Sequence, residues 1–280
     1  MADSSEDRSD ESSRELAPIS EPAASRRVIA GMRLVDRFTI ERKLGQGGMG
    51  RVFAAFDETR QAHVALKTLM RPSRGSLAQL EHEFRIASAL AHPNLVRLHE
   101  FFSDGADWFF TMELVDGETL PELLRKGFEE SKLERVFGEL ACAIAALHRA
   151  GIVHGDLKPS NFLISKETER VVLLDFGLAR PVGDLALELA GGTPLYMSPE
   201  QLAGAEVTEA SDWYSFGVVL FEALTGNLPV RETLEQELVG APERLAALSS
   251  ELLRAERHER PSGREVLSRL GAALASSGPA

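Results

Sequence analysis

The spacing of the apolar residues changes once along the chain, and this change constrains the fold more than any other feature of the sequence. Between Phe38 and Leu66, short runs of alternating apolar residues are separated by glycine-rich or polar turns, which predicts antiparallel hairpins. After Gly117 the period becomes helical, and the apolar residues from Leu133 to Leu147 follow one another at steps of four and three. A sheet followed by helices predicts an α+β fold with two lobes, and we expect the cleft between them near residues 113–118.

Two helices stand out within this order. Apolar residues recur at helical spacing from Leu77 to Leu90, so one helix should accompany the sheet and end near His92. The segment from Trp213 to Leu224 is apolar on nearly every side, which predicts a helix buried at the centre of the helical lobe.

Both ends of the chain are expected to be disordered. Residues 1–30 hold seven serines and seven acidic residues but no aromatic residue, which is too little apolar surface to offset the entropy of ordering. We interpret this segment as an inert, solubilising tail in preference to a phosphorylated or partner-binding one. Residues 273–280 form the corresponding disordered C-terminus.

Charge, cysteine content and the length of the apolar runs indicate the partners and the cellular location of the protein. The chain carries 31 Lys and Arg against 43 Asp and Glu, a net charge of −12, which argues against nucleic acid or an anionic membrane as a partner. The single cysteine, Cys142, excludes an intramolecular disulfide, and no N-terminal leader is visible. The apolar runs are too short to span a bilayer. We therefore expect a cytoplasmic protein without a membrane anchor.

A glycine-rich turn from Gly45 to Val52 joins two of the predicted strands. Its glycines allow the backbone to approach a ligand closely, and its amides would face phosphate oxygens. By itself the motif is weak, because a plain glycine-rich hairpin has the same composition. It is neither a Walker loop, since Gly-Lys-Ser/Thr is absent, nor a Rossmann turn, since a strand follows where a helix should.

Lys67 lies near the end of the next strand, Val64 to Lys67. A lone lysine on a strand is usually a solvated edge residue. The helix that follows offers Glu83, whose carboxylate could hold this lysine towards the phosphates of a nucleotide, and Glu81 is an alternative that periodicity alone does not exclude.

Two loops in the second half of the chain carry the remaining polar chemistry. The segments His154 to Asn161 and Asp175 to Gly177 together offer two carboxylates, one lysine and one amide. Phosphoryl transfer needs oxygen ligands for Mg²⁺, a carboxylate to accept the hydroxyl proton and cations to offset the developing charge. The two loops supply each of these groups.

These motifs, in this order, resemble the eukaryotic-type serine/threonine protein kinases that occur in bacteria. The family order of glycine loop, strand lysine, helix glutamate, catalytic loop, metal aspartate, Pro-Glu anchor, helix aspartate and late arginine is met from Gly45 to Arg260. The resemblance implies a bilobal fold, with an N-lobe of antiparallel sheet plus one helix (31–115) and a mainly helical C-lobe (116–272). It also favours Glu83 over Glu81, because the family glutamate precedes a His-Pro step by the number of residues that separates Glu83 from His92-Pro93.

The resemblance also implies a role for individual residues in transferring the γ-phosphoryl group of ATP to protein Ser or Thr hydroxyls. Asp156 would be the catalytic base, Lys158 would stabilise the transferring phosphate, and Lys67 paired with Glu83 would hold the α and β phosphates. Asn161 and Asp175 would hold Mg²⁺. The expected nucleotide-binding residues are Gly45, Gln46, Gly47, Gly48, Met49, Gly50 and Val52 in the glycine loop, Ala65, Lys67, the gatekeeper Met112, the hinge residues Glu113 and Val115, and Leu163. Of these, Val52, Ala65 and Leu163 match the residues that sandwich the adenine ring.

A buried pair of Glu200 and Arg260 is a further implication of the resemblance. It would tie the peptide-docking segment to the helical lobe, and removing one partner of such a pair costs about 3–5 kcal/mol. We expect its role to be architectural.

Two departures from the family pattern concern regulation. The usual His-Arg-Asp reads His154-Gly155-Asp156, so the arginine that would receive an activation-loop phosphate is missing, and residues 178–192 contain no Ser, Thr or Tyr. A phosphate in that loop would gain no charge-assisted pairing with this arginine. We therefore hypothesise a kinase that is independent of activation-loop phosphorylation, held active by packing or by a regulatory partner.

Two alternatives stay open at this point. His-Gly-Asp also occurs in small-molecule kinases of the same superfold, such as aminoglycoside kinases, although Ser198-Pro199-Glu200 favours a peptide substrate. A pseudokinase that binds without turnover is the other alternative, although no catalytic residue of the family pattern is missing.

Overall fold

The computed structural model describes residues 28–46, 50–69, 74–104, 107–127, 129–176, 179–182 and 194–272. Most of the expected tail, the expected C-terminus and Gly47 to Met49 of the glycine loop therefore lie outside the described residues. Val28, which the sequence placed in the tail, is buried against the first sheet.

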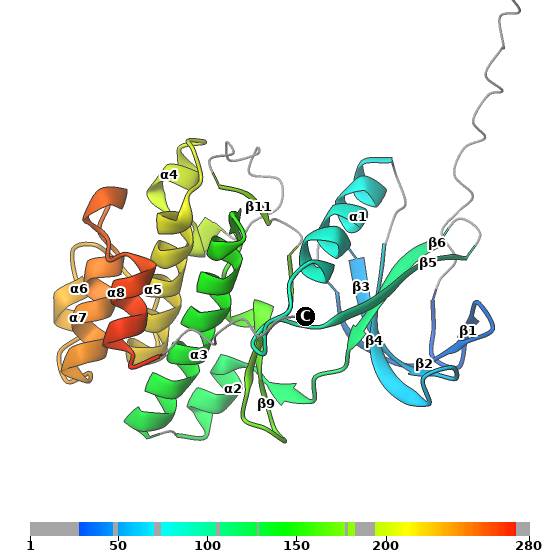
Figure 1. The fold of residues 1–280 in the computed structure, drawn as a ribbon. Helices are drawn as coiled ribbons and strands as arrows, with labels where there is room; N and C mark the ends of the chain where they lie inside the picture. Colours follow the sequence, from blue (N-terminus) through cyan, green and yellow to red (C-terminus); the bar gives the residue numbers. More distant parts are fainter. Residues whose placement is uncertain are drawn as a thin grey trace, which may run out of the picture.

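The first half of the described chain forms a sheet of six antiparallel strands (Figure 1). Their order is β1-β2-β3-β4-β6-β5, so β6 lies between β4 and β5. The strands are β1 (Arg33–Leu34), β2 (Phe38–Gln46), β3 (Gly50–Asp57), β4 (Ala62–Leu69), β5 (Leu98–Asp104) and β6 (Asp107–Glu113). The hairpins predicted from the alternating apolar runs are present.

One helix, α1 (Arg74–Ser88), packs on this sheet and lies on the side nearer the helical lobe (Figure 1). The ring of Phe84 contacts the rings of Phe101 and Phe110, which β5 and β6 present to the helix. Leu80 and Ala87 are buried in the same interface. The apolar stripe that predicted the helix is therefore the face that holds α1 against the strands.

The second half is mainly helical. The helices are α2 (Leu120–Arg125), α3 (Glu130–Arg149), α4 (Pro199–Leu202), α5 (Glu209–Thr225), α6 (Leu234–Glu237), α7 (Glu243–Leu252) and α8 (Gly263–Arg269), with short 3₁₀ turns at Pro159–Asn161, Pro194–Tyr196 and Arg257–Glu259. This half also contains two small sheets: β7 (Gly117–Glu118), β9 (Phe162–Ser165) and β10 (Val171–Leu173) form one, and β8 (Ile152–Val153) pairs with β11 (Arg180–Pro181) in the other. The structure thus confirms the expected fold class, an antiparallel sheet with one helix followed by a helical lobe.

The core is continuous between the two lobes. Ala65 and Met112 on the α1 side of the sheet belong to the same hydrophobic cluster as Phe137 of α3 and Phe216 of α5. The opposite face of the sheet has a separate cluster around Phe38. As expected, α5 is central, because Trp213, Phe216 and Phe221 are almost completely buried. Among the helices of the described residues, none combines the length and the apolar character that crossing a membrane requires.

Candidate active site

Lys67 connects the two lobes through two carboxylates. Its Nζ lies 2.6 Å from Oε1 of Glu83, which α1 presents, and 3.0 Å from Oδ1 of Asp175, which follows β10. The Lys67 and Glu83 residues are only 7% and 2% exposed, whereas Glu81 is exposed. The carboxylate that pairs with the strand lysine is therefore that of Glu83.

The burial of this cluster changes its acid–base behaviour. Burial by itself lowers the pKa of the Lys67 ammonium, but attraction to Glu83 and Asp175 outweighs it and raises the pKa above its ordinary value. Burial raises the pKa of the Glu83 carboxyl to about 7, and the Lys67 ammonium opposes that shift. Lys67 therefore stays protonated at neutral pH.

Asp156 is held in an ordered loop between β8 and β9. Its Oδ2 accepts a hydrogen bond from Lys158 Nζ at 2.7 Å, and Nδ2 of Asn161 donates to its main-chain oxygen at 2.7 Å and to Oδ2 at 3.2 Å. The ring of His154 lies beside Phe176, with 6.1 Å between the ring centroids. The loop thus places a carboxylate, an ammonium and an amide within reach of one another.

A buried aspartate on α5 holds the start of this loop. Oδ2 of Asp212 accepts the main-chain N–H of His154 at 2.8 Å, and Oδ1 accepts that of Gly155 at 2.9 Å. His148 Nε2 also contacts Oδ2, at 2.8 Å. Burial by itself would raise the pKa of Asp212, but these hydrogen bonds hold it below its ordinary value. Asp212 therefore stays ionised and anchors the loop backbone.

Asn161 and Asp175 lie at the same end of one hairpin. In this hairpin Leu173 of β10 pairs with Phe162 of β9, and the N–H of Leu174 donates to the main-chain oxygen of Asn161 at 2.8 Å. Asn161 directly precedes β9 and Asp175 follows β10, and their amide and carboxylate oxygens are donors that Mg²⁺ accepts. The described residues contain no cluster of three or more His, Cys, Asp or Glu that could hold a metal by itself. The donor set fits a Mg²⁺ ion that completes its shell with water and phosphate oxygens.

The expected adenine site lies where the two lobes join. Met112 is buried on β6 and pairs with Ala65 on β4, and Val52 of β3 packs against the same cluster. Leu163 lies on β9 and is half-buried. Glu113 ends β6, and Val115 follows it in the link to β7.

Gly117 is a residue of this region whose role the sequence did not predict. A Cβ at this position would lie 2.9 Å from both the Cβ of Leu163 and the main-chain oxygen of Ile164. Only glycine therefore allows β7 to pair closely with β9. Gly117, after which the helical spacing begins, thus lets the chain approach Leu163, one of the expected nucleotide-binding residues.

The expected glycine loop is described at its two ends. Gly45 and Gln46 end β2, and Gly50 begins β3, where it pairs with Leu69 of β4. Gly47, Gly48 and Met49 lie outside the described residues.

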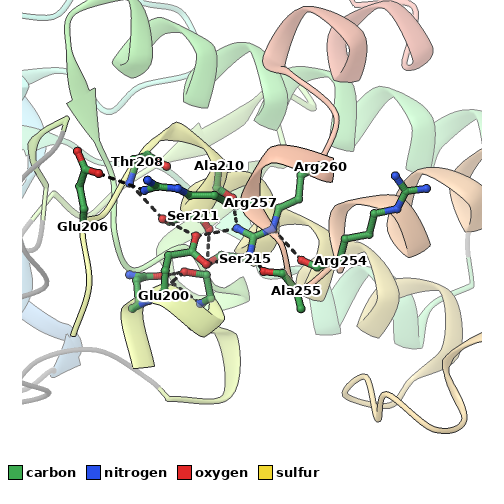
Figure 2. A network of polar contacts seen from close by, with 12 residues as sticks. Glu200, Glu206, Thr208, Ala210, Ser211, Ser215, Arg254, Ala255, Arg257 and Arg260 are labelled. Atoms are coloured by element: carbon green, nitrogen blue, oxygen red, sulfur yellow. Dashed lines mark hydrogen bonds and ion pairs between the residues drawn. The ribbon is translucent and has the colours of Figure 1, made fainter. Parts of the chain in front are cut away.

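Glu200 and Arg260 form a bidentate ion pair in the helical lobe (Figure 2). The two contacts are 2.7 and 2.8 Å long, and the Arg260 side chain is completely buried. The hydroxyl of Ser211 also donates to Oε1 of Glu200. The pair links the segment after Tyr196 to the loop before α8.

Gln201 and His82 are two further residues that the sequence did not single out for the site. Gln201 Nε2 donates to the main-chain oxygen of Gly155 at 2.9 Å, and His82 Nε2 lies 3.1 Å from the main-chain oxygen of Ala179. Gln201 directly follows the Ser-Pro-Glu segment, and His82 directly precedes Glu83. This adjacency to motif residues was the signal in the sequence that could have identified them. Their partners are main-chain atoms, which no side-chain motif reveals.

Comparison with known proteins agrees with this geometry. The model of the protein kinase domain family matches residues 38–269. Serine/threonine-protein kinase pkn2 of Myxococcus xanthus is 39% identical over an alignment of 226 residues, which covers 75% of this chain and 27% of the relative. Pkn3 of the same organism is 36% identical over 71% of this chain and 39% of its own length. The cAMP-dependent protein kinase type 3 of Saccharomyces cerevisiae is 33% identical over 79% of this chain and 56% of its own length.

The chain thus spans less than two thirds of the length of each of these relatives. The family model covers nearly all of the described residues, and the arrangement of Lys67, Asp156 and Asp175 lies within it. The chain therefore belongs to the protein kinase family, in its eukaryotic-type serine/threonine branch.

Proposed function

We propose that this chain transfers the γ-phosphoryl group of ATP, with Mg²⁺, to Ser or Thr hydroxyls of protein substrates. The observation that carries the proposal is the buried Lys67 ammonium, which contacts both Glu83 of the first lobe and Asp175 of the second. In protein kinases an ion pair between a strand lysine and a helix glutamate must be in place beside the metal-binding aspartate for phosphoryl transfer, and Lys67, Glu83 and Asp175 match these groups.

In the proposed reaction the substrate hydroxyl gives its proton to Asp156 while its oxygen forms a bond to the γ-phosphorus. The bond from that phosphorus to the bridging oxygen of ADP breaks. Lys158, within hydrogen-bond distance of Asp156, would neutralise charge on the transferring group, and Lys67 would hold the α and β phosphates. Asn161 and Asp175 would hold Mg²⁺, which offsets phosphate charge when bound.

We also propose that the lobes extend over residues 31–115 and 116–272. The end of β6 at Glu113 and the start of β7 at Gly117 support a boundary between them. Because ATP is made and kept inside cells, we place the activity in the cytoplasm.

Incubation of the full chain with labelled ATP, Mg²⁺ and a generic basic protein, with an aminoglycoside in parallel, tests this function. We expect label on Ser and Thr. Label on the aminoglycoside would support a small-molecule kinase, and nucleotide binding without transfer would support a pseudokinase. In the same assay Lys67→Met should abolish transfer, and retained turnover would remove this lysine from the site.

We further propose that activity is independent of phosphorylation in the activation loop. Gly155 offers no side chain to receive a phosphate, and residues 178–192 contain no Ser, Thr or Tyr. Packing of the loop or a regulatory partner would then hold the active state. Phosphopeptide mapping of the active protein tests this, because an essential phosphate between residues 178 and 200 would contradict it.

A further inference from the structure

The peptide group between Gly155 and Asp156 leads directly to the proposed base, and side chains hold it on both sides. The Gly155 oxygen accepts from Gln201 Nε2 at 2.9 Å, and the N–H of the preceding peptide, that of Gly155, donates to Asp212. The Asp156 N–H donates to Nδ1 of His154 at 3.2 Å. Gly155 has a φ of 76°, in the left-handed region that residues with a Cβ adopt only at a cost of about 1–2 kcal/mol. Glycine adopts this region without that cost, so sterics do not fix the backbone here and the hydrogen-bond partners set the orientation of this peptide.

The Gln201 amide is itself oriented by Ser198. The N–H and the hydroxyl of Ser198 both donate to Oε1 of Gln201, at 3.1 Å each. Both residues are buried, Ser198 completely. Because the amide oxygen accepts from Ser198, the NH₂ group is the end that faces the Gly155 oxygen. A carboxylate here could keep both bonds to Ser198 but would have no hydrogen to donate to Gly155.

Gln201 also belongs to the segment that the Glu200 and Arg260 pair anchors in the helical lobe. It lies on α4, one residue after Glu200, and its own N–H caps that helix on the Ser198 hydroxyl. One neutral side chain thus joins the segment that precedes α4 to the loop that carries Asp156.

We propose that Gln201 is a positioning residue of this kinase, which orients the Asp156 carboxylate by holding the carbonyl of Gly155. The inference rests on the proposed function, since it takes Asp156 as the base. A displacement of about 1 Å in a reacting group lowers a rate by about 100-fold, so loss of this bond should lower kcat about 10- to 100-fold. Nucleotide affinity should stay unchanged, because Lys67 and the hinge lie elsewhere.

The variant Gln201→Glu tests this in the full chain, because it retains the bonds to Ser198 and removes the one to Gly155. Gln236→Glu is the matched control, since it makes the same change at an exposed position of α6. Transfer kinetics, ATP affinity and Tm are measured for each. We expect kcat to fall about 10- to 100-fold for Gln201→Glu, ATP affinity to stay within about twofold, and the control to match the wild type. A kcat within about twofold of the wild type would overturn the inference, whatever the change in Tm. If Gln201→Glu does not fold, Gln201→Met carries the same test.

Hydrogen exchange separates this inference from the proposed function. We expect the Asp156 amide to exchange faster in Gln201→Glu than in the wild type and the control, because the peptide is then free to rotate. Unchanged exchange would overturn the positioning role. If the wild type transfers no phosphate, the proposed function fails, and the exchange result still decides whether Gln201 holds this peptide.

Discussion

The buried pair of Glu200 and Arg260 offers a quantitative test of how the segment around α4 is held. All five N–H groups of Arg260 donate: two to the carboxylate of Glu200 and one each to the main-chain oxygens of Arg254, Ala210 and Ala255 (Figure 2). The Arg260 side chain is 0% exposed and that of Glu200 is 11% exposed. Arg260→Met would leave the carboxylate buried without its cation, so the free energy of unfolding should fall by about 3–5 kcal/mol.

The same reasoning gives the size of the thermal effect. For a chain of this length, 1 kcal/mol shifts Tm by about 2–4 °C, so Arg260→Met should lower Tm by about 6–20 °C. Glu200→Gln leaves the guanidinium without its counter-charge and should have an effect in the same range. The double variant leaves no unpaired charge, so its cost should be smaller than the sum of the two by at least about 1 kcal/mol.

Urea and thermal unfolding of the wild type, the two single variants and the double variant measure this coupling. The control is the surface pair of Arg269 and Glu251, which makes two contacts of 2.9 Å but whose side chains are 40% and 31% exposed. Arg269→Met should lower the free energy of unfolding by less than about 1 kcal/mol. The reasoning would be refuted if the losses of unfolding free energy in the two single variants summed to that of the double variant within about 0.5 kcal/mol. It would also be refuted if Arg269→Met lowered the free energy of unfolding as much as Arg260→Met.

Three further predictions follow from the site. Asp156→Asn keeps the shape of the side chain but removes the base, so the rate of phosphoryl transfer should fall by about 100- to 10,000-fold. ATP affinity, measured by titration, should stay near that of the wild type. An undiminished transfer rate would show that Asp156 is not the base. Gly117→Ala should lower stability by about 1–3 kcal/mol in urea unfolding and weaken ATP binding, because its Cβ would collide with β9; a neutral effect on both would show that the hinge relaxes easily. Burial alone would raise the pKa of Glu200, but its hydrogen bonds to Arg260 hold that pKa below the ordinary 4.5. The coupling free energy between Glu200 and Arg260 should therefore be constant from pH 7 to about 5 and shrink as the pH falls through the lowered pKa. Coupling that persists unchanged at about pH 2 would contradict this last prediction.

The order of strands and helices could be predicted because it is a local property. Alternating apolar residues from Phe38 to Leu66 and helical spacing from Leu133 to Leu147 each depend on a few neighbours along the chain. The structure has strands and a helix at these positions. The boundaries differ by several residues, because hydrogen bonding between strands extends β2 to Gln46 beyond the apolar run.

The choice between Glu81 and Glu83 shows where residue spacing is insufficient. Both lie on one helix, two residues apart, and either carboxylate could have been assigned to Lys67 on periodicity alone. In the structure α1 turns Glu83 into the interface with the sheet and leaves Glu81 in solvent. The rotation of the helix about its axis is set by packing of its whole apolar face, which includes Phe84 against Phe101 and Phe110.

The sequence by itself determined the kind of fold and the chemical groups available to it, since period, turn residues and motif order are all written along the chain. Only the tertiary structure decided which of those groups meet. Gln201 reaches the main-chain oxygen of Gly155 across 46 positions, and Asp212 reaches the N–H of the same residue across 57. The physical reason is that main-chain donors and acceptors are the same at every residue, so the pattern of side chains cannot show which of them a distant side chain will bind.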